Sequence, residues 1–311
     1  MSATLCPNAA FGPASTPRLS VLVPFFRDDP VPLLVMLERE ARGLGGAVEI
    51  VVLHDGSGDA TLAGRAQAQV AAMKTPALLI DLAVNEGRAK GRNRLAGQAR
   101  ADHLLFLDSD MAPDAPDFLA RYLALIRADA PPVVFGGFSV PDARPGGAFA
   151  FHIALALRGE SAPAALRTLQ PEKYVFTSNL LVRRDVFDAE AFDEGFSGWG
   201  WEDVEWGMRV ARRFGLLHID NPATHLGLDT AAAIAAKYES STANFARILA
   251  RHPQVIMAYP SYRLARVLRR TPFRKVWRGM LKAAALSPLP PMIARIAAMK
   301  VYRAALYAEV V

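Results

Sequence analysis

Short apolar runs alternate with amphipathic segments along most of this chain. Between the apolar runs, apolar residues recur at helical spacing, as in Leu33, Leu34, Leu37 and Ala41. Apolar runs without alternation are typical of strands that are buried on both faces. The pattern therefore predicts an α/β fold, with a mostly parallel central sheet and helices on both faces. Strands are expected at about residues 19–23, 48–53, 77–82, 103–107, 132–135, 176–182 and 216–219.

The pattern is different at the two ends of the chain. The first 17 residues are rich in Pro and Ala and show no periodicity, whereas residues 230–252 predict one long alanine-rich helix. From Tyr262 onward the predicted helices are amphipathic and basic, and prolines interrupt them. We therefore expect a disordered N-terminal segment over residues 1–17, one α/β domain over residues 18–255 and a basic helical extension over residues 256–311.

The positive charge is concentrated in the C-terminal extension. The 311 residues carry a net charge of +6, but residues 261–311 hold eleven Lys or Arg and a single acid, Glu309, a net charge of +10. The rest of the chain is mildly acidic, which argues against nucleic acid as a partner of the body. Basic amphipathic helices with aromatic residues such as Phe273 and Trp277 are typical of proteins that bind an anionic membrane surface. Packing on the body or on a second subunit is the alternative.

Cysteine usage and hydropathy bear on the compartment. Cys6 is the only cysteine, so no disulfide can form within one chain, as is typical of a reducing cytoplasm. The sequence shows neither a signal-peptide pattern nor an uncharged apolar stretch long enough to span a bilayer. We expect a cytoplasmic protein that binds peripherally to the inner face of the cell membrane.

Polar side chains follow the predicted strands. The apolar run at 104–107 ends at Asp108-Ser109-Asp110, and alternate residues of an extended chain point the same way, so both carboxylates could meet one hard cation. A simple strand-end turn is the alternative. Asp55 and His225 also follow strands, and in a parallel sheet such positions gather at one edge.

Residues 85–93 open a predicted helix that carries several cations. A helix N-terminus favours anions, and Arg88, Lys90 or Arg92 could add positive charge near a diphosphate. A solvated basic helix start is the alternative.

Together these motifs resemble the inverting glycosyltransferases of the GT-A fold, family 2-like, which use nucleotide-sugar donors. The first predicted strand and its following turn resemble the family's donor-binding start, which implies that Pro24 and Phe25 contact the donor. The second strand ends where the family usually has two adjacent acids. Here His54 replaces the first, and the resemblance implies that Asp55 binds the uracil ring.

The Asp-x-Asp sequence resembles the metal-binding motif of the same family. The resemblance implies that Asp108 and Asp110 hold Mn²⁺ or Mg²⁺ against the donor diphosphate, with Ser109 beside the donor. His225 stands where the family often places a third metal ligand.

The segment 196–205 resembles the Gly-Trp-Gly-x-Glu-Asp segment of β-1,4-galactosyltransferases and chondroitin-polymerase-type enzymes. The resemblance implies that Asp203 is the general base and that Glu202 binds substrate hydroxyls. Trp199 would stack on a sugar ring, and Gly200 would let the backbone approach the acceptor. Core packing of the tryptophans, and acids that only complement the helix dipole, are the alternatives.

The resemblance implies a metal-dependent inverting hexosyltransferase. The expected donor is a UDP-sugar carrying galactose, N-acetylgalactosamine or N-acetylglucosamine. The expected acceptor is a glycan or lipid-linked carbohydrate in surface polysaccharide or glycolipid synthesis. A non-catalytic sugar-nucleotide- or carbohydrate-binding protein that keeps the fold is the alternative. Nucleotidyltransferases and dehydrogenases are disfavoured, because no glycine-rich loop follows the first strand.

Overall fold

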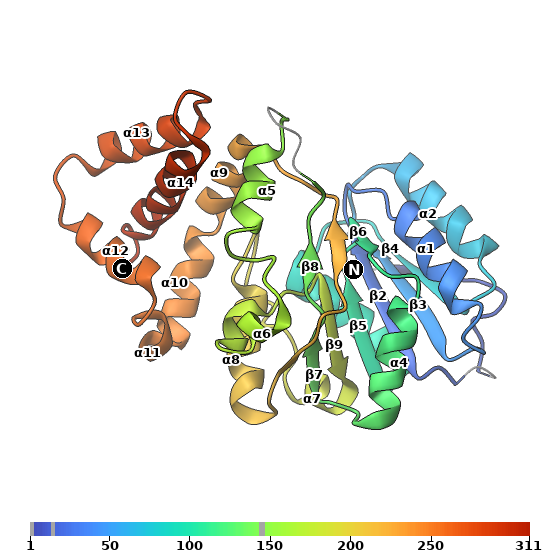
Figure 1. Ribbon diagram of the computed structural model, residues 1–311. Coiled ribbons are helices and arrows are strands. Elements are labelled where there is room, and N and C mark those ends of the chain that lie inside the picture. Colours follow the sequence, from blue (N-terminus) through green and yellow to red (C-terminus); the bar gives the residue numbers. More distant parts are fainter. Residues whose placement is uncertain (1–2, 14–15, 143–146) are drawn as a thin grey trace. The chain divides into compact units, whose positions relative to one another are not determined.

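The computed structural model describes residues 3–13, 16–142 and 147–311, which form two compact units (Figure 1). The first unit comprises Met1–Pro141, Ser161–Glu194 and Trp206–Gly227, and the second comprises Asp142–Glu160, Gly195–Glu205 and Leu228–Val311. The strands are β1 Ala3–Pro7, β2 Leu19–Phe25, β3 Val48–His54, β4 Ala77–Leu82, β5 His103–Leu107, β6 Met111–Pro113, β7 Val133–Phe135, β8 Phe138–Ser139, β9 Asn179–Arg183, β10 Leu217–His218 and β11 Ala223–His225.

Helices connect the strands of the first unit. They are α1 Val31–Ala41, α2 Ala60–Ala72, α3 Arg88–Gln98, α4 Phe118–Ala128, α6 Ala164–Arg167, the 3₁₀ helix Pro171–Tyr174, α7 Arg184–Ala189 and most of α8 Glu202–Arg213. The helices of the second unit are α5 Ala150–Ala156, α9 Ala231–Ser240, α10 Thr242–Arg251, α11 Pro253–Ile256, α12 Pro260–Arg269, α13 Arg274–Leu286 and α14 Met292–Tyr307.

The large sheet of the first unit has the strand order β1-β4-β3-β2-β5-β9-β7-β10. Strands β4, β3, β2 and β5 run parallel to one another, β9 runs antiparallel to both of its neighbours, and β10 is parallel to β7. The expected mostly parallel central sheet is confirmed.

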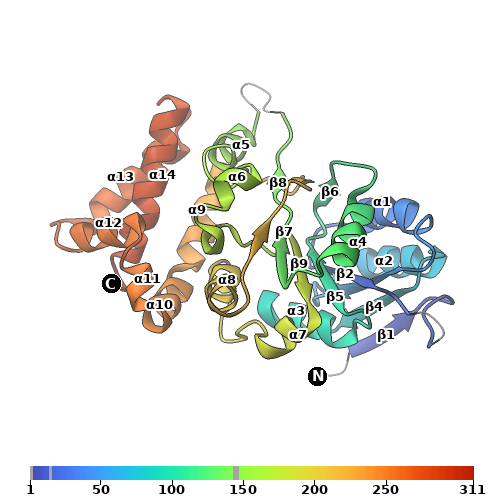
Figure 2. The ribbon, with the colours of Figure 1, turned by 60° about the horizontal axis from the view of Figure 1, so that its bottom comes forward.

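Alternate side chains of each strand enter two separate apolar layers. In β2, Val21 and Val23 pack with α1, α2 and α4, whereas Leu22 packs with α3 and α7 on the other face (Figure 2). This burial on both faces explains why the strands are apolar without interruption, and it confirms the predicted helices on both faces.

The N-terminal segment differs from the disordered stretch expected over residues 1–17. Ala3–Pro7 form β1, which pairs antiparallel with β4, and Asn8 binds the backbone at Met73, Thr75 and Ala77. Edge pairing supplies backbone hydrogen bonds that do not depend on an apolar periodicity, so the sequence pattern missed it. Residues 1, 2, 14 and 15 lie outside the described part of the chain.

A second, three-stranded sheet has the order β6-β11-β8. In it β11 pairs antiparallel with β6, so that His225 lies opposite Met111. The backbone N–H of Leu226 also donates to the carbonyl of Asp110 at 2.8 Å. This pairing brings the end of β11 beside the segment that follows β5.

The second unit is helical, and it differs in two ways from the sequence expectation. It begins before residue 255, because α9 and α10 pack on α14. The single helix expected over residues 230–252 is divided at Ser241 into α9 and α10. The buried Ser241 hydroxyl donates to the Tyr238 carbonyl, a local bond that competes with helix continuation.

Among the described residues, no helix has the length and apolarity needed to cross a membrane.

Candidate active site

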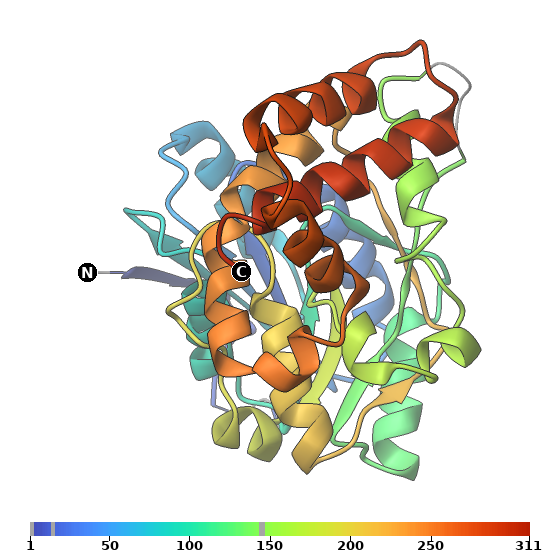
Figure 3. The same ribbon diagram turned by 90° about the vertical axis from the view of Figure 1, so that its left-hand side faces the viewer.

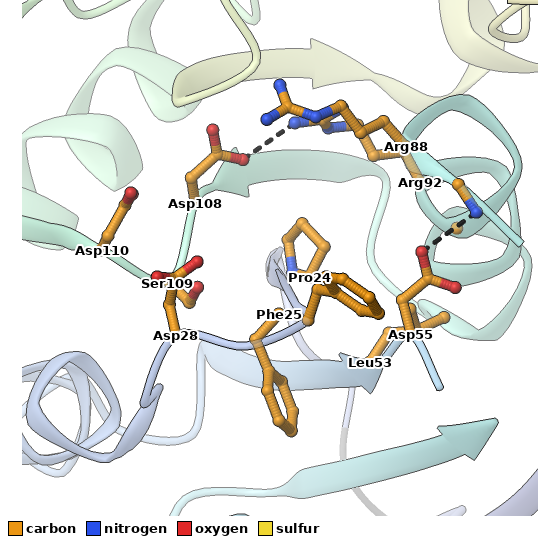
Figure 4. Close-up of a pocket in the computed structure, with 13 residues that line it drawn as sticks. Pro24, Phe25, Asp28, Leu53, Asp55, Arg88, Arg92, Asp108, Ser109 and Asp110 are labelled. Carbon is orange, nitrogen blue, oxygen red and sulfur yellow. Dashed lines mark hydrogen bonds and ion pairs between the residues drawn. The ribbon is translucent and has the colours of Figure 1, made fainter. Parts of the chain in front are cut away.

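A pocket lies at the carboxyl ends of β2, β3 and β5 in the first unit (Figure 4). This edge is where open α/β sheets bind ligands. Of the ten residues considered as donor or metal ligands, eight line this pocket, and Lys90 and His225 are the exceptions. The lining residues are Pro24, Phe25, Phe26, Asp28, Leu53, Asp55, Gly87, Arg88, Gly91, Arg92, Asp108, Ser109 and Asp110.

Arg92 and Asp108 form an ion pair at one side of this pocket. The Arg92 Nη2 lies 2.9 Å from the Asp108 Oδ1, and only 3% of the Arg92 side chain is exposed. Arg88 lies one turn earlier in α3, on the same side of the pocket (Figure 4). Two guanidinium groups and the N-terminal turn of α3 therefore give this side of the pocket the character of an anion site.

Asp55 connects β3 to the loop that precedes α3. Its carboxylate accepts hydrogen bonds from the Asn85 side chain at 2.9 Å and from the backbone N–H groups of Glu86 and Gly87 at 2.7 and 3.0 Å. A carboxylate has about four acceptor positions, so one remains for a ligand N–H. Gly56 makes this approach of two backbones possible, since a Cβ there would lie 2.3 Å from the Val84 carbonyl carbon.

His54 holds the end of β3, a role that the sequence did not reveal. Its Nδ1 lies 2.7 Å from the Asp81 Oδ1 and its Nε2 lies 2.6 Å from the Ser57 hydroxyl. Its ring also stacks on Phe25, with 4.9 Å between the ring centroids. The imidazole therefore fixes both the loop that carries Asp55 and one wall of the pocket.

Asp110 and His225 form a second pair, at the meeting of the two sheets. The His225 Nε2 lies 3.2 Å from the Asp110 Oδ2. Gly227 must lack a side chain, because a Cβ there would lie 1.9 Å from that same oxygen. Burial alone would raise the pKa of Asp110, but the hydrogen bond and the positive charge of His225 lower it overall.

The Asp110–His225 pair suits a divalent metal ion. Among the described residues, the Asp110 Oδ1 is one of the few buried polar atoms without a hydrogen-bond partner. A carboxylate oxygen beside an imidazole nitrogen is a donor set that Mn²⁺ accepts. Asp108, by contrast, is directed towards Arg92, and no group of three His, Cys, Asp or Glu in the described residues is arranged to hold a metal. A metal here would depend on ligand oxygens beside the protein pair, as is usual for Mg²⁺ with phosphates.

The segment Gly195–Glu205, which holds the remaining predicted residues, belongs to the second unit. Gly198, Gly200 and Trp201 all have positive φ angles, of 74°, 83° and 78°, so the chain turns tightly here. The Asn244 side chain binds this loop, donating to the carbonyls of Ser197 and Gly200 at 2.8 and 2.9 Å. Asn244 was not singled out from the sequence, because it lies within a helical pattern.

The two tryptophans of this loop have different environments. Trp201 is buried, with its indole N–H donating to the Tyr307 hydroxyl at 2.9 Å and its ring against Phe245. It is therefore a core residue, despite a backbone conformation that costs about 1–3 kcal/mol in a non-glycine residue. Trp199 is partly exposed and contacts Tyr238 on one side, with 5.9 Å between the ring centroids. Trp199 is the one of the two with ring surface accessible to a sugar.

Three acids stand in the first turn of α8. Glu202 and Glu205 are buried, and Glu205 pairs with His252 at 3.0 Å. Asp203 is partly exposed, and its Oδ1 accepts from the backbone N–H of Val204 at 2.8 Å. Asp203 is therefore the acid of this turn best placed to exchange a proton with a bound molecule.

Comparison with known proteins agrees with this architecture. Residues 20–189 match the model of a family described as Glycosyl transferase family 2. A search of curated proteins finds no significant match. The mannosyltransferase PcManGT from Pyrobaculum calidifontis, solved with GDP-Man and Mn²⁺, is 15% identical over 98% of this chain and 88% of that one, with a TM-score of 0.55.

Two further solved structures share the fold. S. aureus TarS 1–349, in complex with UDP-GlcNAc, is 17% identical over 92% of this chain and 89% of that one, with a TM-score of 0.51. Glucosyl-3-phosphoglycerate synthase from Mycobacterium tuberculosis, with Mn²⁺, UDP and glucosyl-3-phosphoglycerate, is 17% identical over 75% and 80%, with a TM-score of 0.50. At these identities the similarity shows the fold, and it confirms the GT-A fold expected from the sequence.

Proposed function

Because this chain belongs to glycosyl transferase family 2, we propose that it transfers a sugar from a UDP-sugar to a carbohydrate hydroxyl, with inversion at the anomeric carbon. The observation that carries the proposal is the pocket at the sheet edge, where two arginines from α3 stand beside the strand-end carboxylates Asp108 and Asp110. Such an arrangement suits a diphosphate accompanied by a divalent cation.

The donor would lie along the pocket, from Asp55 to the Asp110–His225 pair. The free acceptor position of Asp55 suits the imide N–H of uracil, and Pro24 and Phe25 supply apolar surface for the base. Arg88 and Arg92 would bind diphosphate oxygens. Galactose, N-acetylgalactosamine and N-acetylglucosamine are the donor sugars that we propose to test.

Asp110 and His225 are the side chains that would hold Mn²⁺ or Mg²⁺. When bound, the cation supplies positive charge that stabilises the departing nucleoside diphosphate. Asp108 would contribute through its pair with Arg92, which keeps the guanidinium oriented at the pocket.

Asp203 would act as the general base of a single displacement. Its carboxylate takes the proton of the acceptor hydroxyl as the new bond from that oxygen to the anomeric carbon forms. The bond from the anomeric carbon to the diphosphate oxygen breaks in the same step, and UDP leaves from the opposite side. Trp199 would stack on the acceptor sugar, with Gly200 leaving room for its approach and Glu202 binding a hydroxyl.

The test is nucleotide release over a panel of UDP-Gal, UDP-GalNAc, UDP-GlcNAc and GDP-Man, with and without Mn²⁺. We expect slow Mn²⁺-dependent release of UDP from one UDP-sugar, and faster release when a glycan or lipid-linked acceptor is added. Asp203→Asn should bind that donor normally and lose at least about a hundredfold in transfer rate. Donor binding with no nucleotide release across the panel would instead support the non-catalytic binding protein.

A further inference from the structure

The outward face of α13 is apolar, whereas a surface helix normally turns its polar face to water. Phe273, Val276, Trp277 and Met280 follow the spacing i, i+3, i+4 and i+7, so they form one stripe. They are 78%, 60%, 52% and 57% exposed, respectively. We call these four residues the apolar stripe.

The opposite face of α13 is the one attached to the rest of the second unit. Arg278 pairs with Glu309, and Lys282 donates to Glu239 at 2.6 Å. Ala285 is fully buried on the same side, where α13 packs against α14. Ion pairs and a small buried residue therefore fix α13 against the helices of the second unit (Figure 3), and the exposed apolar stripe lies on its other face.

Cations lie close to the apolar stripe in the sequence. Arg274 and Lys275 are exposed on α13 itself, and Arg270 is exposed at the end of α12, just before it. Arg263 and Arg266 are exposed earlier on α12. Within the described part of the chain, these five side chains have no carboxylate partner. Glu239 and Glu309, the acids that come before and after this stretch in the sequence, are already paired with Lys282 and Arg278.

The combination of aromatic, aliphatic and basic side chains fits an anionic lipid bilayer. Trp and Phe settle at the boundary between headgroups and acyl chains, while Arg and Lys bind lipid phosphates and the negative surface potential. A second copy of the chain fits less well, because a symmetric contact would bring two sets of unpaired cations together.

We propose that α12 and α13 bind an anionic membrane surface, with the apolar stripe inserted between the headgroups and the flanking cations on the lipid phosphates. The attachment is peripheral, in keeping with the length and polarity of the described helices. It does not depend on the proposed transfer reaction, since none of its residues lies in the donor pocket.

The test is co-sedimentation of the full chain with vesicles. We expect binding to vesicles of equal parts phosphatidylglycerol and phosphatidylcholine, at least about tenfold weaker binding to phosphatidylcholine alone, and loss of binding in high salt. The variant Trp277→Glu/Met280→Glu should lose at least about tenfold in partitioning to the mixed vesicles. Leu169→Glu is the matched control, since Leu169 is 76% exposed on the first unit and should change nothing.

Insertion of Trp277 can be read separately. Lipids brominated on their acyl chains should quench part of the tryptophan fluorescence of the wild-type chain. Trp277→Phe should retain vesicle binding and lose that part of the quenching.

Several results would overturn the proposal. They are equal binding to both kinds of vesicle, no binding to either, or unchanged binding of the double variant with its thermal unfolding intact. Dimers in light scattering that Trp277→Glu/Met280→Glu dissociates would assign the apolar stripe to a second copy instead.

Discussion

The imidazole of His225 lies 3.2 Å from the carboxylate of Asp110, although the two residues come from distant parts of the chain. The pair exists because β11 returns antiparallel to β6 and ends beside the strand that delivers Asp110. The last segment of the first unit thus supplies one member of the pair, and the segment that follows the central strand β5 supplies the other.

His225→Ala should weaken Mn²⁺-dependent UDP binding by at least about tenfold, because it removes the nitrogen beside the Asp110 carboxylate, whose Oδ1 has no hydrogen-bond partner. Isothermal titration with UDP, in Mn²⁺ and separately in EDTA, measures the effect. In EDTA the variant and the wild-type chain should bind alike. Asp117→Asn, at an exposed surface pair, should match wild type in both buffers. Equal loss with and without the metal would rule out His225 as a ligand.

Gly227→Ala should perturb the same pair without removing either member. Its Cβ would lie 1.9 Å from the Asp110 Oδ2, and relief of such overlap typically costs about 1–3 kcal/mol. We expect a lower midpoint in urea unfolding and weaker Mn²⁺-dependent binding of UDP. Gly64→Ala is the matched control, because Gly64 lies in α2 with open space around it and should stabilise by about 0.5–1 kcal/mol. Similar effects of the two substitutions would contradict the predicted overlap.

Arg92→Met should lower stability and UDP binding far more than the loss of an exposed arginine does. Arg92 is 3% exposed and its removal deprives Asp108 of a charged partner, so we expect about 1–3 kcal/mol of lost stability and weaker UDP binding. Arg65→Met breaks a pair of comparable length with Asp29, at 2.6 Å, but Arg65 is 57% exposed. Such surface pairs contribute about 0–1 kcal/mol. The two variants are compared by urea unfolding and UDP titration, and equal effects would refute the prediction.

Trp201→Phe and Tyr307→Phe should be energetically coupled. Each removes the hydrogen bond between the indole N–H and the Tyr307 hydroxyl, which joins the Gly-Trp-Gly loop to α14. A double-mutant cycle in urea should give a coupling free energy of about 0.5–1.5 kcal/mol. A coupling near zero would show that the loop is held without this bond.

Stability should fall in mild acid because of His218. Burial, with a smaller contribution from the Arg167 charge, lowers the pKa of His218 to about 4 from 6.5. Between these values the unfolded chain binds the extra proton, so the free energy of unfolding decreases by up to about 3 kcal/mol as pH falls from 6.5 to 4. Above about pH 7.5 this contribution is constant, since the histidine is then neutral in both states.

His218→Gln should flatten that dependence, since glutamine does not titrate but can still accept from Arg167 or donate to the Pro171 carbonyl. Denaturant unfolding at several pH values between 4.5 and 7.5 measures the slope. Part of it should remain, because burial also lowers the pKa of His103. An unchanged slope in the variant would contradict the prediction.

Apolar continuity was enough to locate the central strands and the residues that follow them. Buried parallel strands need uninterrupted Val, Leu and Ile, and their carboxyl ends converge, so Asp55, Arg92 and Asp108 could be placed at one edge before any coordinates. The partners of these residues could not. Asp108 and Asp110 belong to one sequence motif. Only the directions of their side chains in the fold decide that Asp108 binds Arg92 and Asp110 binds His225.

Contacts between distant segments of the chain could not be predicted from the sequence either. His54 reaches Asp81, Asn244 reaches the Gly-Trp-Gly loop, and Asn8 at the end of β1 reaches Met73, each through hydrogen bonds of one polar side chain. Such contacts leave no periodicity, because each involves one polar residue within a segment patterned for another purpose. The division of the long helix at Ser241 was missed for the same reason.

The hydrogen bond between Trp201 and Tyr307 bears on which acceptor molecules the Gly-Trp-Gly loop can contact. Trp199, the loop that carries it and the apolar stripe of α13 all belong to the second unit. If that unit rests on a bilayer as proposed, the ring of Trp199 is held at a set height above the lipid phosphates. The protein would then prefer lipid-linked acceptors whose terminal sugar extends that far from the bilayer, and it would use shorter acceptors poorly.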